Sequence, residues 1–338
     1  MSETPTSSLL ARTAVTAIAP VTWGTTYLVT SQWLPPDHPL VSGLLRALPA
    51  GLIAVAIGRV RPHGNWWWRA AVLGVLNIGA FFALLFVAAY RLPGGVAATL
   101  GAVSPLAVSG LAFLLLRERP TRWRLAWAVA GVVGVALMVL QPGARLDGWG
   151  ILAGLGGTAS MSAGIVLTRK WGRPVGVVPF AGWQLSAGGL FLFPIALAVE
   201  GLPPRLSVTA AGGYLWLGLV GALLAYVLWF RGIGLLPVVS VSFLSLLSPV
   251  VATALGWIVL GEKLTSVGTF GFGLALLAVV AGQLPPRTRP RRQQPAPATH
   301  PAPHRPPTPP PKGPCHEDRR HRSIRERRKP HRGRSATP

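Results

Sequence analysis

The sequence predicts an all-α polytopic membrane protein with ten transmembrane helices arranged as two inverted five-helix repeats. Half of the 338 residues are apolar, and 13 tryptophans accompany only 9 acidic residues. Between residues 13 and 284 the chain is a series of apolar runs of about 20 residues, the length that a helix needs to cross about 30 Å of hydrocarbon. A motif that occurs twice, 144 residues apart, indicates the repeat.

The apolar runs give the expected spans in order. We expect helices near residues 13–32, 39–58, 69–90, 95–116, 123–141, 149–168, 177–198, 211–231, 238–260 and 266–284. The connections are short, so neighbouring helices should pack antiparallel. No cleavable signal peptide is recognisable before Arg12, so the first helix should be retained. The only cysteine, Cys315, excludes an intrachain disulfide and a multi-cysteine metal site, and no cofactor is expected.

The duplicated motif combines a Ser-Pro pair with a glutamate. Pro105 of Ser104–Pro105 lies thirteen residues before Glu118, and Pro249 of Ser248–Pro249 lies thirteen residues before Glu262. Proline and glutamate keep this spacing although both are uncommon among the surrounding apolar residues. Internal duplication of this kind is typical of transporters built from repeated halves.

The first helices of the two halves align at a slightly different offset. A shift of 138 residues places Ala19–Trp33 on Gly157–Trp171 and Arg46 on Gln184. The offset changes to 144 in the longer connection at Gly201–Gly213. Helices one to five therefore repeat as helices six to ten. Because five is odd, the two copies should have opposite orientations in the membrane, which provides a route to alternating access.

Three regions follow from this alignment. Residues 11–141 are the first five-helix repeat, residues 148–284 are the second, and residues 285–338 form a tail. The tail is rich in Pro, Arg and His and contains 15 basic and 3 acidic residues, so it cannot bury a core and should be disordered. One hypothesis is that the positive charge of the tail attracts anionic lipids. The alternative is that the tail is an extension without a specific partner. The high pI does not indicate specific nucleic-acid binding.

Lysines and arginines predict the orientation. With the N-terminus inside, the cytoplasmic side holds twelve basic residues between Arg12 and Arg231, whereas the opposite loops hold only four. This asymmetry agrees with the positive-inside rule. The N-terminus and the C-terminal tail are therefore both expected in the cytoplasm, with the chain in a bacterial cytoplasmic membrane.

The pattern resembles a known family. The doubled five-helix unit, Trp23–Gly24, Arg46 and the Pro-x12-Glu spacing are similar to the EamA domains of the drug/metabolite transporter superfamily. The resemblance covers residues 11–284 and implies an inner-membrane carrier for a metabolite, with many relatives acting as exporters. The second half departs from the pattern, because Met161–Ser162 stands where the first half has Trp23–Gly24.

Arg46 is the first candidate substrate-binding residue, because it is the one full charge expected well inside a span. An intramembrane charge costs several kcal/mol unless it faces a cavity or a partner. Its guanidinium is suited to bidentate binding of a carboxylate or phosphate. The alternatives are snorkelling to the outer interface or a structural bond to a neighbouring helix.

The repeated prolines and glutamates are candidates for conformational roles. Pro105 and Pro249 are expected in mid-helix, as hinges or as packing kinks, since proline removes a backbone donor. Glu118 and Glu262 are expected at helix ends on opposite membrane faces, as gates or as ordinary interfacial carboxylates. No Asp, Glu or His lies in mid-span, so proton coupling has no support.

Several polar and aromatic residues inside the spans complete the candidate set. Trp23, Asn77, Gln184 and Tyr226 are assigned to substrate binding, with plain packing or an interfacial aromatic belt as the alternative. Tyr27 and Ser162 are weaker candidates of the same kind.

The leading function is a secondary transporter that moves a small metabolite or amphipathic compound, outward, by alternating access. Its expected partners are the substrate and the lipid bilayer, and a homodimer stays open. A membrane-embedded enzyme acting on lipids is the alternative, but the convergent titratable residues that such catalysis needs are missing from the spans. A passive channel is a third reading.

Overall fold

The computed structural model of the chain describes residues 5–36, 38–92, 94–139, 147–201, 206–261 and 265–284. These residues belong to the first of two units, which spans residues 1–287. Glu262 and the tail expected from residue 285 onward lie outside the described residues. The described part of the chain consists of helices and their connections and contains no strand, so the predicted all-α class is confirmed.

Within the described ranges the helices form ten successive stretches, five in each half. The first half consists of α1 (Pro5–Trp33), α2 (Pro39–Gly58), α3 (Trp66–Gly74), the π-helix η1 (Val75–Gly79), α4 (Ala80–Arg91), α5 (Gly94–Ala102), α6 (Ser104–Leu116) and α7 (Arg122–Val139). The second half consists of α8 (Gly148–Trp171), α9 (Val177–Val199), α10 (Val208–Leu215), the π-helix η2 (Trp216–Leu224), α11 (Ala225–Leu235), α12 (Val238–Leu244), α13 (Leu247–Leu260) and α14 (Ser266–Gln283).

Eight of these stretches are long and apolar enough to cross a membrane, counted within the described residues. The remaining two, α1 and α7, are helices of 29 and 18 residues at the places of the expected first and fifth spans. Large apolar side chains cover the outer surface, for example Leu114, Trp149 and Ile258, which are 65%, 71% and 71% exposed. An apolar exterior around a packed interior is what a bilayer requires of a protein. The chain is a polytopic α-helical membrane protein.

Both halves interrupt the same two stretches. The third stretch contains a π-helical segment in each half, η1 and η2. The fourth stretch is broken in each half, between α5 and α6 and between α12 and α13. Because Pro105 lies in the first turn of α6, its missing N–H leaves no hydrogen bond unmade. Pro249 lies in the first turn of α13. Each proline nevertheless lies inside one apolar span, Ala98–Leu116 or Val238–Leu260, so the break before it is a short turn within the span.

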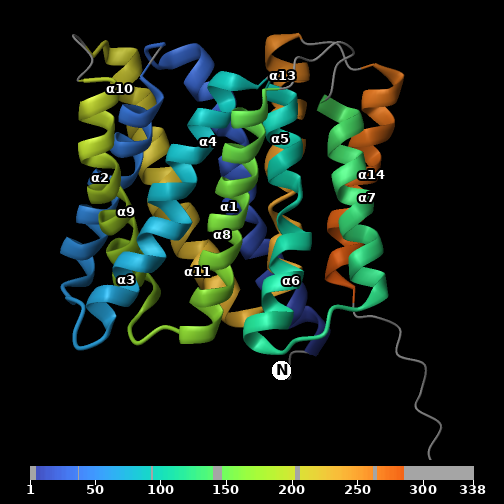
Figure 1. The fold of residues 1–338 in the computed structure, drawn as a ribbon, viewed down its shortest axis with the longest axis horizontal. Coiled ribbons are helices and arrows are strands. Elements are labelled where there is room, and N and C mark those ends of the chain that lie inside the picture. The colour runs from blue at the N-terminus through green and yellow to red at the C-terminus, as the bar shows by residue number, and fades with distance from the viewer. Residues whose placement is uncertain are drawn as a thin grey trace, which may run out of the picture. The chain divides into compact units, whose positions relative to one another are not determined.

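Contacts between the helices follow the repeat. The two halves meet where α2 packs on α9 and α7 packs on α14, each a helix against its own counterpart. The contact of α4 with α8 is matched by that of α11 with α1, and the contact of α6 with α8 by that of α13 with α1. In Figure 1 the connection from α6 to α7 lies at the end where α1 begins, whereas α14 begins at the opposite end.

Candidate functional site

The Arg46 guanidinium lies between the two halves. Arg46 belongs to α2, and its Nη2 donates a hydrogen bond of 2.8 Å to the carbonyl oxygen of Gly221 in η2. Its Nη1 lies 3.4 Å from Oγ1 of Thr26 on α1, and its Cζ lies 5.3 Å from the centre of the Phe82 ring. The charge therefore lies inside the bundle, so the snorkelling alternative does not describe this residue, whereas the bond to the Gly221 carbonyl is the structural bond of the other alternative.

Gly221 accepts two side-chain hydrogen bonds at one oxygen. Besides Arg46, the indole Nε1 of Trp23 donates to the Gly221 carbonyl at 3.0 Å. A π-helix widens the backbone spiral, and such segments are often found at functional sites. The local structure of η2 thus presents a main-chain acceptor to the interior, and α1 and α2 both bind it.

A second polar cluster surrounds Asn77, in η1. Nδ2 of Asn77 donates to Oε1 of Gln184 at 2.8 Å and lies 3.4 Å from Oγ1 of Thr168. The hydroxyl of Tyr226 donates to the carbonyl oxygen of Asn77 at 3.4 Å. Asn77 and Gln184 are buried, at 1% and 0% exposure. The structure thus brings three of the sequence candidates, Asn77, Gln184 and Tyr226, into one hydrogen-bonded group.

The two clusters are counterparts in the repeat. Arg46 and Gln184 are 138 residues apart, and Gly221 and Asn77 are 144 apart, which are the offsets of the corresponding helices. The pair Arg46–Gly221 in one half thus corresponds to the pair Gln184–Asn77 in the other. The repeat conserves the position of the contact but changes its chemistry, because one cluster contains a full positive charge and the other contains neutral amides.

Aromatic rings connect the two clusters. Trp23 lies between Tyr226 and Trp229, with ring centres 5.3 and 5.1 Å apart. Tyr226 also contacts Phe230 at 5.6 Å, and Phe230 contacts Phe180 at the same distance. Tyr226 is only 2% exposed, so an interfacial belt position for it is wrong. The sequence analysis did not identify Trp229 and Phe230 as site residues, because aromatic residues in this chain are too common to stand out.

Some buried donors in this region have no hydrogen-bond partner among the described residues. They are Nε of Arg46, Nε2 of Gln184 and Nε1 of Trp229. Leaving a buried polar group unpaired costs about 1–3 kcal/mol. All three are nitrogen donors, so the group that would satisfy them is a hydrogen-bond acceptor.

The Trp23–Gly24 motif has a packing role in its second residue. A Cβ at Gly24 would lie 2.5 Å from Cβ of Val251 and 2.9 Å from the carbonyl oxygen of Ser248. Gly24 therefore lets α1 approach the first turn of α13, where Ser248 precedes Pro249. The motif thus allows the first half to pack closely against the segment of the second half that contains Pro249.

Ser162 and Tyr27 contribute less to the site. Ser162 is fully buried, and its Oγ lies 3.4 Å from Oγ of Ser104, so it joins α8 to the start of α6. The side chain of Tyr27 lies outside the described residues. Neither residue is brought into the Arg46 or the Asn77 cluster by any described contact.

Glu118 is not brought into the site by any described contact. Glu118 is exposed just beyond the end of α6, where Arg117 adopts a left-handed conformation and the Glu118 N–H bonds to the carbonyl of Ala112. Glu262 lies outside the described residues. The geometry of Glu118 fits a helix-end residue as well as a gate.

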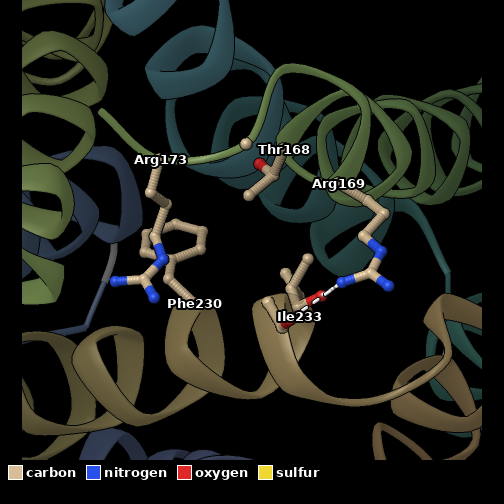
Figure 2. Close-up of a pocket in the computed structure, with 7 residues that line it drawn as sticks. Thr168, Arg169, Arg173, Phe230 and Ile233 are labelled. Atoms are coloured by element: carbon tan, nitrogen blue, oxygen red, sulfur yellow. Dashed lines mark hydrogen bonds between the residues drawn. The ribbon is translucent and has the colours of Figure 1, made fainter. Parts of the chain in front are cut away.

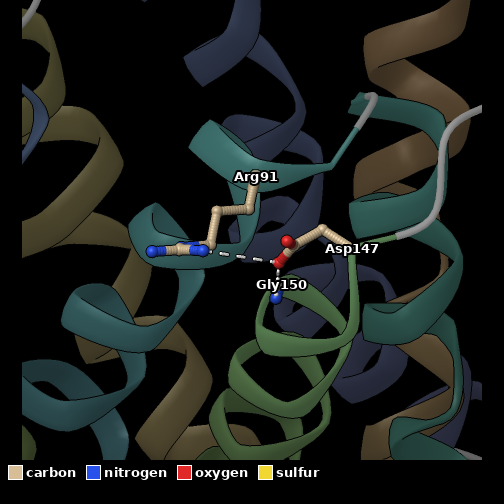
Figure 3. Close-up of polar contacts among 3 residues, drawn as sticks. All are labelled: Arg91, Asp147 and Gly150. Atoms are coloured by element: carbon tan, nitrogen blue, oxygen red, sulfur yellow. Dashed lines mark hydrogen bonds and ion pairs between the residues drawn. The ribbon is translucent and has the colours of Figure 1, made fainter.

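Carboxylates that the sequence pattern did not single out stabilise two helix starts. Glu200, which follows α9, accepts hydrogen bonds from the N–H groups of Leu40 and Val41 at 2.8 and 2.9 Å, and thereby caps α2 from a distant segment. Asp147 caps α8 by accepting from the Gly150 N–H at 2.7 Å. Figure 3 shows that Asp147 also faces Arg91, at 3.7 Å. Glu200 thus joins the two halves, whereas Asp147 mainly caps its own helix, and neither contacts the interior clusters through a described bond.

Comparison with known proteins gives consistent results. The profile of the EamA-like transporter family matches the chain twice, at residues 13–140 and 148–281. Protein PecM of Dickeya dadantii is 46% identical over 267 residues, which cover 78% of this chain and 90% of that protein. An uncharacterized inner membrane transporter of Escherichia coli K12, YedA, is 31% identical over 77% of this chain and 86% of its own length.

Two further similarities are more distant. A probable terminal-alkyne amino-acid exporter of Streptantibioticus cattleyicolor is 28% identical over 77% of this chain and 89% of its own length. A solved crystal structure has a TM-score of 0.69 at 19% identity, over 80% of this chain and 96% of that chain, and shows a shared fold. Because the family profile covers both halves, the chain belongs to the EamA-like transporter family.

Proposed function

We propose that this membrane transporter exports a small metabolite or amphipathic compound from the cytoplasm, as a secondary carrier, by alternating access of two inverted repeats. The observation that carries the proposal is the pair of corresponding polar clusters at the contact between the halves, Arg46–Gly221 and Gln184–Asn77. A binding site between two related halves can be opened to either side by their relative movement.

The substrate that fits this site carries an anionic or acceptor group beside an apolar body. Arg46 supplies the positive charge, and the unpaired donors of Gln184 and Trp229 supply further hydrogen bonds. Trp23 and Tyr226 supply apolar ring surface. The amino-acid exporter among the relatives is named for a substrate class that contains a carboxylate, which agrees with this chemistry.

The broken stretches supply the movement in this proposal. Pro105 and Pro249 lie in the first turns of the second segments of the corresponding stretches, so rotation about the two breaks would reorient α6 and α13. Glu118 and Glu262 would then act as gates at opposite ends. We place both termini in the cytoplasm, because the basic connections then lie inside.

Counterflow in proteoliposomes tests the function directly. Labelled amino acids, nucleosides and cationic dyes are offered to liposomes loaded with the same unlabelled compound. A carrier gives a transient overshoot of label that saturates with concentration, whereas a channel gives neither. Absence of exchange for every compound under every gradient would reject the carrier.

The family and the named relatives are transporters, so the alternative of an enzyme acting on lipids has no support from them.

Arg46→Gln is the sharp test of the site. Removing a charged hydrogen-bonding partner costs about 1.5–3 kcal/mol, so we expect the transport of an anionic substrate to fall by about ten- to a hundredfold. Arg61→Gln is the matched control, because Arg61 lies in the exposed connection between α2 and α3. Unchanged transport of an anionic substrate by Arg46→Gln would remove Arg46 from the site.

A further inference from the structure

A second site lies at the end of the bundle where α8 and α11 finish. A pocket of about 210 Å³ opens there between the two helices. Its lining is Thr168, Arg169, Gly172, Arg173, Phe230, Ile233 and Gly234. None of the residues assigned above to substrate binding lines this pocket, although Phe230 separates it from Tyr226.

The two arginines of the pocket are bound differently. Nη1 of Arg169 donates to the carbonyl oxygens of Ile233 and Gly234, at 3.2 and 2.8 Å. Arg169 thus satisfies the free carbonyls at the end of α11, where a positive charge also interacts well with the helix dipole. Arg173 makes no hydrogen bond or ion pair with the described residues. Figure 2 shows its guanidinium beside Phe230, apart from the contact that Arg169 makes with Ile233.

The charge around Arg173 is unbalanced. Arg173 is half-buried in the connection after α8, and this burial, followed by the positive charge of Arg231, lowers its pKa. Arginine nevertheless stays protonated at neutral pH. The only ion pair within the described ranges joins Arg91 to Asp147, so no described carboxylate neutralises this end of α11. Two guanidinium groups, those of Arg169 and Arg173, thus line the pocket, and the positive charge of Arg231 acts on Arg173.

We propose that this pocket binds a phosphoryl anion, either as free phosphate or as the headgroup of an anionic phospholipid, with Arg173 as the principal contact. Arg169 shapes the wall by holding the end of α11, and Arg231 adds charge. The site is independent of the transport proposed above, because binding at Arg173 requires no movement of the halves. Thr168 lines the pocket and also contacts Asn77. A ligand in the pocket would therefore lie beside a residue that belongs to the Asn77 cluster.

Chemical modification of arginine tests the proposal without a transport assay. The purified full-length protein in a nonionic detergent is treated with phenylglyoxal, and peptide mass spectrometry follows the modification of each arginine. The treatment is repeated with inorganic phosphate, with sodium chloride at equal ionic strength, with phosphatidylglycerol and with phosphatidylcholine. An anion that protects the site and is present at a concentration of about ten times its dissociation constant should slow the modification of Arg173 by about tenfold. Exposed Arg61 measures general screening in the same sample.

Two variants of Gly234 supply a matched pair. A Cβ at Gly234 would lie 3.6 Å from Nε and Nη2 of Arg173, an ordinary contact, so Gly234→Ala fits the pocket and should behave like the wild type. Gly234→Asp places a carboxylate within reach of Arg173. It should slow the modification of Arg173 without any added anion and remove the further protection by phosphate.

The arms separate the sources of the anion. Protection by both phosphate and phosphatidylglycerol supports recognition of the phosphoryl group itself. Protection by phosphate alone supports a soluble ligand. Protection by phosphatidylglycerol alone supports a lipid ligand. The proposal is overturned when neither anion slows Arg173 more than Arg61. It is also overturned when Gly234→Asp leaves the reactivity of Arg173 at the wild-type level.

Discussion

Asn77 in η1 donates a hydrogen bond of 2.8 Å to Gln184 in α9, and this bond joins the two halves of the protein at full burial. In a membrane interior water is not available to replace such a bond, yet measured side-chain bonds between transmembrane helices average only about 0.6 kcal/mol, with a maximum near 1.7. We therefore expect the bond to fix the relative position of the two halves more than it adds to the stability of the protein.

A double-mutant cycle measures this bond. Asn77→Ala and Gln184→Ala should each lower the free energy of unfolding in detergent, and the double variant should lose less than their sum by about 0.6–1.7 kcal/mol. Ser109→Ala combined with Asn77→Ala is the control, because Ser109 bonds only to Pro105 of its own helix. Strict additivity for Asn77 and Gln184 would show that their contact contributes nothing in solution.

Gly24→Ala should destabilise the protein because of its close approach to α13. The new Cβ would lie 2.5 Å from Cβ of Val251, so the helices must separate. Overpacking of this kind typically costs about 1–3 kcal/mol, measured as a lower Tm in detergent. Gly110→Ala in α6 is the control: nothing lies within 4 Å of its Cβ, so it should be neutral or slightly stabilising. Equal Tm values for both variants would contradict the packing role of Gly24.

Glu200→Ala should weaken the start of α2. It removes both acceptor oxygens from the N–H groups of Leu40 and Val41, and loss of a helix cap typically costs about 1–2 kcal/mol of unfolding free energy. Glu200→Gln retains one acceptor but loses the charge that favours a helix N-terminus, so its loss should be smaller. Val199→Ala, at a side chain that is 69% exposed, is the local control. A glutamine variant as unstable as the alanine variant would argue against the hydrogen-bond explanation.

Asp147→Ala and Arg91→Ala should differ although they break the same ion pair. The pair is half-exposed, and exposed pairs contribute about 1 kcal/mol or less, so Arg91→Ala should change the unfolding free energy little. Asp147→Ala also removes the cap of α8, which is worth about 1 kcal/mol. Asp147→Ser, which keeps a capping oxygen, should restore most of the stability. Equal losses for the two alanine variants would mean that the ion pair matters more than the cap.

Some of the site could be predicted from the sequence. Arg46 was recognisable because a charge is expensive in a span, and its alignment with Gln184 was visible in the 138-residue offset. The partner of Arg46 was not recognisable, because a glycine carbonyl has no sequence signature. Glu200 was missed for the same reason: its partners are main-chain N–H groups 160 and 159 residues away.

The sequence by itself determined the helical class and the membrane location and showed the duplicated motif, because apolar length and residue spacing are properties of the chain alone. Only the tertiary structure decided which groups meet. It placed a short turn before each Ser-Pro pair in the fourth stretch and π-helical segments in the third, and it set Gly221 and Asn77 opposite Arg46 and Gln184. Those contacts depend on how two halves pack against each other, and side-chain spacing along one helix does not specify the face that a distant helix presents.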